Sequence, residues 1–364
     1  MSLEEKTARI ILEDGTEFEG SSFGYEGSVA GDIVFYNGAD APAPLFTDPS
    51  LRGTILVMAQ PQVGNTGIPE DEVDNLGLET DFESGQAQIS GLVVMDYCDT
   101  PSHWKNKKPL AKWLRKQQVP ALSGVDTRAL IQRIRLRGSM RAKILVEETK
   151  DVSFSSAGVY PSAYAAARRV VRYGTGTRKI ALIDCGAKNS QVRALVSEGT
   201  TVVRVPCSSD LPDERFDGFV VSGGPGDPTA YEKTIALVKG LIAERKPLFA
   251  IGQGAVILAI AGGAASYRMT QGHRGQGVPC VNLETGRCHV TAQNHGYGIR
   301  DDSLPPDWYP TFLNNTDNSI EGFATAKGLI SGVLFQPEGN PGPRETAFLY
   351  EAFLEIVRNG GVRA

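Results

Sequence analysis

Short apolar runs separated by helical segments dominate the second half of the chain. Four such runs have the length and composition of buried strands, at 179–184, 201–205, 218–222 and 247–251. Helical patterns at 190–197 and 230–244 lie between them. This alternation predicts a mostly parallel α/β sheet, in which ligands bind at the carboxyl ends of the strands.

The first half has the pattern of a β-rich domain. Its strand-like and helical runs are, in order, 8–12, 17–19, 32–36, 54–58 and 91–95, then 110–117 and 127–137. Asp14-Gly15, between the first two runs, is a hairpin signal. We therefore expect an α+β domain over 1–146, a linker with one short helix over 147–177, and an α/β domain over 178–364.

The run at 247–251 leads into a tight turn and then into an apolar helical segment. Gly252 and Gly254 mark the turn, and residues 256–260 continue as a helix. Strand, sharp turn and helix form the arrangement in which hydrolases expose a nucleophile on a strained backbone. Here the tip is Gly252, which adopts a positive φ readily but has no reactive side chain. The sequence therefore predicts a nucleophile elbow without a nucleophile.

Composition narrows the classes of function. The chain has 364 residues, of which 41% are hydrophobic and 22% charged, and this is enough for two globular domains. A net charge of −5 argues against a nucleic-acid-binding surface. No apolar run approaches the roughly 20 residues of a membrane helix, and the N-terminus lacks the apolar region of a signal peptide. We expect a cytoplasmic protein that binds neither nucleic acid nor membrane.

Cysteine and histidine positions do not predict a metal centre. The five cysteines are scattered and include no CxxC spacing, which argues against a zinc site or a disulfide framework. His273 and His289 are expected to serve loop hydrogen bonds, and the basic cluster at 168–172 a solvated face of the linker. We therefore predict no metal and no cofactor.

Several loop motifs point to a family when they are taken together. The glycine-rich loop at 222–228 alone fits either an anion-binding loop or a plain turn. The loop is more specific when it is taken together with other motifs. In the second half these are HVTAQNHGY at 289–297, NNT at 314–316 and LFQPEGNPGP at 334–343. In the first half they are ILEDGT at 11–16, TDPS at 47–50, VGN at 63–65, GLVV at 91–94 and VDTR at 125–128. This set resembles class I glutamine amidotransferases and, over nearly the whole chain, the small subunit of carbamoyl-phosphate synthetase. The resemblance implies an α/β protein, with a β-rich α+β small-subunit domain followed by a flavodoxin-like, mostly parallel amidotransferase domain.

The resemblance also implies a chemistry that this chain has lost. In the family a Cys at the elbow attacks glutamine, a His relays protons and a Glu orients the His. The ammonia passes to a large ATP-dependent subunit, which makes carbamoyl phosphate for arginine or pyrimidine biosynthesis. The family elbow, G-I-C-L-G-H-Q, is AIGQGAV here, so Gly252 replaces the Cys, and Ala255 and Val256 replace the H-Q pair. Gln336 replaces the His of H-P-E, and Glu338 alone is retained. Gly252 supplies no thiolate, and the amide of Gln336 does not titrate near neutral pH.

The family's glutamine pocket is partly retained. Matching positions are Gly38, where the family has a Ser, and Gly224, Gly226, Gln253, Asn294, Gly296 and Tyr297. Their backbone donors could hold a small carboxylate or amide, or the glycines could be kept because the loops need those turns, which is the reading we favour. Cys185 with His295 as base is a remote alternative nucleophile, because a cysteine at a strand end is usually an inert apolar residue.

These observations predict a pseudo-glutaminase. We expect a non-catalytic or regulatory subunit that binds a large ATP-dependent carbamoyl-phosphate synthetase subunit and leaves it to use free ammonia. The alternative is a stand-alone scaffold or small-molecule-sensing protein derived from this subunit. An active amidotransferase with a relocated nucleophile is the least favoured reading.

Overall fold

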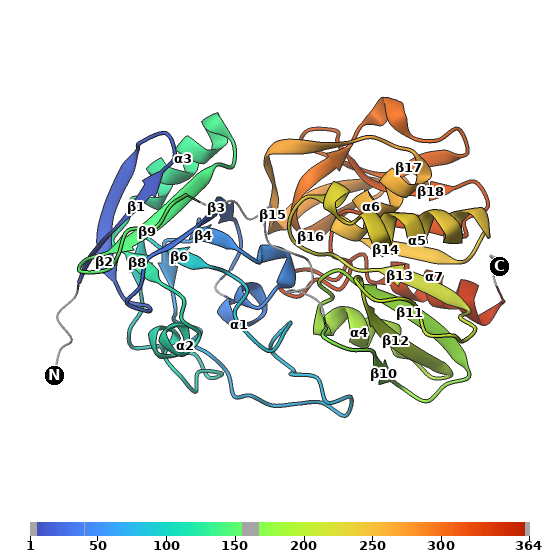
Figure 1. Cartoon of the computed structure of the whole chain (residues 1–364), viewed down its shortest axis with the longest axis horizontal. Coiled ribbons are helices and arrows are strands. Elements are labelled where there is room, and N and C mark those ends of the chain that lie inside the picture. The colour runs from blue at the N-terminus through green and yellow to red at the C-terminus, as the bar shows by residue number, and fades with distance from the viewer. Residues whose placement is uncertain (1–5, 40, 155–166, 361–364) are drawn as a thin grey trace. The chain divides into compact units, whose positions relative to one another are not determined.

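The computed structural model describes residues 6–39, 41–154 and 167–360, and the chain divides into two compact units, 1–160 and 161–364. Figure 1 shows the elements of both units. Each unit has its own buried apolar core. None of the helices in the described part of the chain has the length and apolar character needed to cross a lipid bilayer.

The first unit is built on a closed β-barrel. In order around the barrel its strands are β1 (Thr7–Leu12), β2 (Glu17–Ser22), β8 (Ala121–Ser123), β6 (Gly91–Val93), β4 (Thr54–Met58), β3 (Val29–Tyr36) and β9 (Arg141–Val146). Strands β3, β4, β6 and β8 run parallel, and the remaining neighbours pair antiparallel. Closure leaves the barrel without a free edge.

Helices cover parts of this barrel. They are α1 (Pro42–Phe46), α2 (Leu110–Lys116) and α3 (Thr127–Arg137), and a small sheet joins β5 (Gln62–Val63) to β7 (Asp96–Tyr97). Asp126 caps the N-terminus of helix α3, and its side chain accepts a hydrogen bond from the backbone N–H of Ala129. Its buried residues Leu130 and Ile134 join the barrel core around Ile33.

The second unit is built on one sheet that has helices on both faces. Its strand order is β10 (Val171–Tyr173), β12 (Thr200–Pro206), β11 (Arg178–Asp184), β13 (Gly218–Val221), β14 (Leu248–Ile251), β19 (Ile330–Val333), β18 (Ile320–Thr325), β17 (Trp308–Asn314), β15 (Ser266–Asn282) and β16 (Cys288–Ile299). The stretch from β12 to β19 is parallel, in the order of a flavodoxin-like sheet. Strand β10 and the arm from β18 to β16 pair antiparallel.

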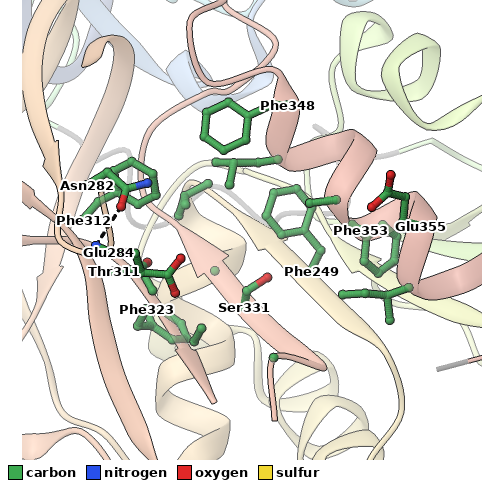
Figure 2. A pocket seen from close by; sticks show the side chains of 17 residues that line it. Phe249, Asn282, Glu284, Thr311, Phe312, Phe323, Ser331, Phe348, Phe353 and Glu355 are labelled. Atoms are coloured by element: carbon green, nitrogen blue, oxygen red, sulfur yellow. Dashed lines mark hydrogen bonds between the residues drawn. The ribbon is translucent and has the colours of Figure 1, made fainter. Parts of the chain in front are cut away.

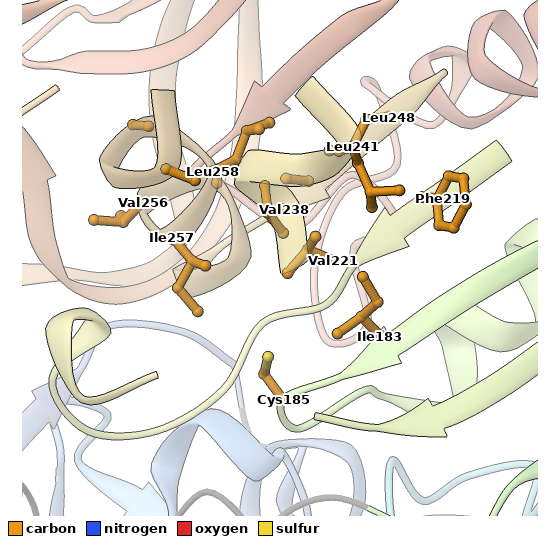
Figure 3. Close-up of a cluster of buried hydrophobic side chains, with 14 of the residues drawn as sticks. Ile183, Cys185, Phe219, Val221, Val238, Leu241, Leu248, Val256, Ile257 and Leu258 are labelled. Atoms are coloured by element: carbon orange, nitrogen blue, oxygen red, sulfur yellow. The ribbon is translucent and has the colours of Figure 1, made fainter. Parts of the chain in front are cut away.

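Helices pack on both faces of this sheet. They are α4 (Asn189–Leu195), α5 (Glu232–Ala243), α6 (Gln253–Gly262) and α7 (Phe348–Arg358). Leu248 and Ala250 of β14 face the apolar cluster formed with α5 and α6, part of which Figure 3 shows. Phe249 points to the other face, where its ring stacks on Phe353 of α7 at 5.8 Å between centroids. The alternating residues of β14 thus join both layers.

The expected fold class is confirmed, with two additions to the expected elements. The predicted strands and helices of both halves are present, within a few residues of the expected bounds. However, strand β10 lies inside the segment 147–177, for which we expected only a helix, and residues 155–166 of that segment fall outside the described residues. The antiparallel arm of β15 to β18 was also not predicted. Its long strands contain residues of the sequence motifs described above, which we had not assigned to strands.

Candidate functional site

The candidate site residues of the second unit gather at one edge of its sheet. Strands β11, β13, β14 and β19 are neighbours, and their carboxyl ends meet at this edge. The segments that follow them are the loop at 184–188, the glycine-rich loop at 222–228, the turn at Gly252 and the loop containing Gln336 and Glu338. This edge is where a parallel sheet binds its ligand.

Gly252 has the backbone of a nucleophile elbow. It sits between β14 and α6 with φ +58° and ψ −127°, and its N–H donates to the carbonyl of Val333 at 2.8 Å. A Cβ placed there would have Gly223 Cα at 3.6 Å and the oxygen of Leu334 at 3.9 Å as its nearest neighbours. These are ordinary van der Waals distances, so the turn has space for a side chain that this sequence does not provide.

The start of α6 packs tightly onto the sheet. A Cβ on Gly254 would lie 2.3 Å from the oxygen of Val221, so only glycine fits there. Ala255 and Val256 are fully buried in the apolar cluster. The amide of Gln253 donates to the carbonyl of Gly226 at 2.6 Å. Side chains at the elbow therefore pack the helix or brace the glycine-rich loop, and none of these offers an acid or a base.

Glu338 is held in a buried polar network. Its Oε1 lies 3.1 Å from Nζ of Lys188 and accepts from Nε2 of Gln191 at 3.2 Å, while its Oε2 accepts from the hydroxyl of Tyr350 at 2.8 Å. The side chains of Lys188 and Glu338 are 1% and 2% exposed. Lys188 also donates to Oε1 of Gln336 at 3.1 Å. The carboxylate therefore forms an ion pair with Lys188 and accepts hydrogen bonds from α4 and α7. Both of its oxygens have partners.

The sequence analysis missed Lys188, Gln191 and Tyr350. Lys188 lies 150 positions from Glu338, and nothing in a linear pattern connects them. One signal was available, because a lysine in the short loop between a strand and the following helix lies at the ligand edge of a parallel sheet.

Cys185 does not have the surroundings of a reactive thiol. Its side chain is fully buried in the apolar cluster, among Ile183 and Val221 (Figure 3). Burial raises the pKa of the Cys185 thiol well above its usual range, and the neighbouring Cys207 acts in the same direction. The ring nitrogens of His295 contact the carbonyl of Tyr297 and the side chains of Gln293 and Glu321. These contacts do not support Cys185 and His295 as a reactive pair.

The remaining pocket residues are placed as follows. A Cβ on Gly224 would lie 2.3 Å from the oxygen of Cys185, and Gly226 has φ +81°. Both glycines are therefore required by the loop itself, which supports the structural reading of their retention. Asn294, Gly296 and Tyr297 lie on β16, where Tyr297 packs partly against the apolar cluster. Gly38 belongs to the first unit, shortly after β3.

A polar cluster lies on the antiparallel arm. His273 of β15, His295 of β16 and Glu321 of β18 bring a ligand atom each to within 4.8 Å of one another. Burial alone would raise the pKa of Glu321, but His295 and His273 hold it at about 2. Burial lowers the pKa of His273, but its hydrogen bonds to Glu321 and Asp317 and their negative charges raise it by more, so the net shift is upward.

A cavity of about 290 Å³ lies on the α7 side of the sheet. Figure 2 shows aromatic rings around it, among them Phe249, Phe323 and Phe353, with Glu284 and Glu355 also in its wall. None of the candidate site residues lines this cavity. It is therefore separate from the strand-end site.

Comparisons with known proteins match both units. The family model described as "Carbamoyl-phosphate synthase small chain, CPSase domain" matches residues 10–144, and "Glutamine amidotransferase class-I" matches residues 181–356. "Carbamoyl-phosphate synthase (ammonia), mitochondrial" of Homo sapiens is 40% identical over 369 residues, covering 99% of this chain and 24% of the relative. "Carbamoyl phosphate synthase arginine-specific small chain" of Aspergillus oryzae is 38% identical over 363 residues, covering 96% of this chain and 80% of the relative.

The extent of these matches differs among the relatives. The chain spans about a quarter of the length of the mammalian relatives, at 24% each for the mouse, human and rat proteins. Among solved structures, a glutamine amidotransferase from Thermotoga maritima aligns at 17% identity and TM-score 0.39, covering 51% of this chain and 86% of that one.

Proposed function

The chain belongs to the carbamoyl-phosphate synthase small-chain family, and from this membership we propose that it is a non-catalytic or regulatory subunit of an ammonia-using carbamoyl-phosphate synthetase. Its glutaminase site is degenerate. Its partner is a large ATP-dependent synthetase subunit, whose ammonia entrance it caps or gates.

The elbow at Gly252 carries this proposal. Glutamine hydrolysis in this family proceeds through a thioester, and a glycine has no atom with which to form one. Loss of the nucleophile alone removes roughly six powers of ten from the rate of a hydrolase of the serine type. The turn keeps its φ of +58° and the free space above it, so the loss concerns the chemistry and leaves the fold intact.

Proton transfer is lost as well. The amide of Gln336 cannot act as a general base, and it accepts a hydrogen bond from Lys188. Glu338, which would orient a histidine, instead pairs with Lys188 at 3.1 Å. Two of the three catalytic positions, Gly252 and Gln336, therefore carry residues that cannot perform the reaction. The third, Glu338, forms an ion pair with Lys188.

No other described cysteine of this unit replaces the missing thiol. Cys207 and Cys280 are buried, and burial raises the pKa of the Cys280 thiol far above its usual range. Cys288 is exposed but begins β16, six residues before Asn294, which is about 20 Å along a strand. The names of the mammalian relatives, which specify ammonia, are consistent with a synthetase of this family that does not depend on glutamine.

Purified protein is expected to release no ammonia from glutamine. The rate with millimolar glutamine should equal that of a sample treated with a thiol alkylator, because no accessible thiol lies at the elbow. A coupled glutamate and ammonia assay measures both. Turnover that the alkylator abolishes would contradict the proposal, and mass spectrometry of a trapped adduct would locate the nucleophile.

The large synthetase subunit of the same host is expected to co-elute with this chain at micromolar concentration. Carbamoyl-phosphate synthesis by that complex should run with ammonium salts and show no response to glutamine. Docking can differ from that of relatives, because the segment 37–44 departs from the family pattern and α1 begins at Pro42. Separate elution in sizing and pull-down experiments would instead favour the scaffold or sensor alternative.

A further inference from the structure

Two histidines and a glutamate converge on the antiparallel arm, and one oxygen of the glutamate has no hydrogen-bond donor. Nδ1 of His273 lies 2.7 Å from Oε1 of Glu321, and Nε2 of His295 lies 3.4 Å from its Oε2. The Glu321 side chain is fully buried, and its Oε2 has no hydrogen-bond partner. A buried carboxylate oxygen without a partner calls for an explanation.

The outer contact of His273 determines which of its nitrogens has a proton in the neutral ring. Its Nε2 lies 3.0 Å from Oδ2 of Asp317, a carboxylate that can only accept, so Nε2 donates. The neutral ring then has a lone pair on Nδ1, which faces an oxygen of Glu321 at 2.7 Å and the amide nitrogen of Asn314 at 3.3 Å. The lone pairs on Nδ1 and on the Glu321 oxygen repel at this distance, and a cation bound to both atoms, either a proton or a metal ion, removes the repulsion.

The same argument applies to His295. Its Nδ1 lies 3.0 Å from the carbonyl oxygen of Tyr297 and therefore donates, which leaves the lone pair on Nε2. That atom faces Oε1 of Gln293 at 3.2 Å as well as Glu321. The amide orientation of Gln293 is fixed, because its nitrogen donates to the hydroxyl of Thr291, which itself donates to Val278. A second cation would thus be needed at Nε2 of His295.

One divalent ion satisfies both requirements. Two added protons would instead make two imidazolium rings, with centroids 5.2 Å apart, beside the carboxylates of Glu321 and Asp317. We propose that His273 Nδ1, His295 Nε2 and the carboxylate of Glu321 bind a divalent metal ion, preferably zinc. A single ion between the three ligands neutralises Glu321 while both rings stay neutral. This assigns His273 a role beyond the loop hydrogen bond that we expected from the sequence.

The groups around the three ligands have the arrangement typical of metal sites. Each histidine donates its other N–H to an oxygen, His273 to Asp317 and His295 to a backbone carbonyl, and this orients a ligating imidazole. The amide nitrogen of Asn314 donates to Oε1 of Glu321 at 3.2 Å, and its oxygen is engaged by the N–H of Thr316. All three ligands are therefore held by an outer contact.

The distances and donor types favour zinc. Two ligand atoms on one tetrahedral zinc lie about 3.3 Å apart, given bonds of about 2.0–2.1 Å. The observed separations of 2.7 and 3.4 Å lie on either side of this value. Two imidazoles and one carboxylate form a ligand set that zinc accepts with a fourth position open. Solvent reaches the cluster from the side of Asp317, whose side chain is 44% exposed.

Metal content and affinity test this site directly. We expect untagged full-length protein to contain about one zinc per chain by elemental analysis, and chelator-treated protein to take up zinc with a rise in Tm. Cobalt in its place should give the visible absorption of a tetrahedral site. His273→Gln should abolish the uptake, and the Asp317→Asn variant should weaken zinc binding by about 10–100-fold with unchanged circular dichroism.

His289→Ala is the matched control, since His289 is a partly buried histidine of the same unit outside this cluster. It should bind zinc as the unmodified chain does. If chelator-treated, folded protein binds zinc no better than the His273→Gln variant, the cluster holds protons and the metal site is wrong. Asp317→Asn decides the question even if the His273 variant fails to fold, because unaltered zinc affinity in it would also overturn the proposal.

Discussion

Lys188→Met is expected to lower the free energy of unfolding of the second unit by about 3–5 kcal/mol. The substitution keeps the length and apolar stem of the side chain but removes the charge. Glu338, whose side chain is 2% exposed, would then be a buried carboxylate without its cation. The amide oxygen of Gln336 and the carbonyl of Asn340 would lose a donor as well. Urea denaturation followed by circular dichroism measures the loss.

Two further variants show whether the burial of the charge causes the effect. Lys233 pairs with Asp210 at 2.9 Å on the surface, with side chains 53% and 91% exposed, so Lys233→Met should change stability by less than about 1 kcal/mol. Removing both charges with Lys188→Met and Glu338→Gln together should recover much of the loss, because no unpaired charge remains. A loss below about 1 kcal/mol in the single Lys188 variant would show that the network matters little.

The double substitution Gly252→Cys and Gln336→His is expected to leave glutaminase activity at least about a hundredfold below that of an active family member. The elbow itself accepts a side chain, since the nearest atoms to a Cβ lie 3.6 and 3.9 Å away. The obstacle lies in the surroundings of position 336. A histidine there would face the ammonium group of Lys188, and Glu338 would not be available to orient it. Misplacement of a catalytic group by about 1 Å already costs about a hundredfold in rate.

Glutamate release by the double variant, compared with Gly252→Ser and Gln336→His together, isolates the contribution of the thiol. A chloroketone analogue of glutamine would show in parallel whether the new cysteine reacts at all. A rate equal to that of an active relative would mean that the supporting residues matter less than we argue. In that case the Lys188–Glu338 pair would have to rearrange freely.

Sequence patterns predicted those features that depend on neighbouring residues. The turn at Gly252 follows from an apolar run, two glycines and an apolar helix, all within about ten residues. The parallel order of the sheet follows from the alternation of strands and helices. The absence of a nucleophile needed only the identity of one residue once the turn was recognised.

Features that depend on distant residues were not predictable in this way. The Lys188–Glu338 pair joins positions 150 apart. The polar cluster of His273, His295 and Glu321 joins β15, β16 and β18 across 48 positions. Strand β10 has only three residues and owes its conformation to pairing with β12. Such contacts arise from sheet register and packing, which no single segment encodes.

The backbone angles of Gly252 have a consequence for the stability of the second unit. A residue with a side chain at φ +58° and ψ −127° costs about 1–3 kcal/mol of conformational energy, which active hydrolases bear as part of catalysis. A glycine there releases that energy to the folded state. Because proteins sit close to a stability threshold, a cost of this size is a substantial fraction of the total stability. Gly252→Cys alone is therefore expected to lower the free energy of unfolding by about 1–3 kcal/mol, although the turn has room for the side chain.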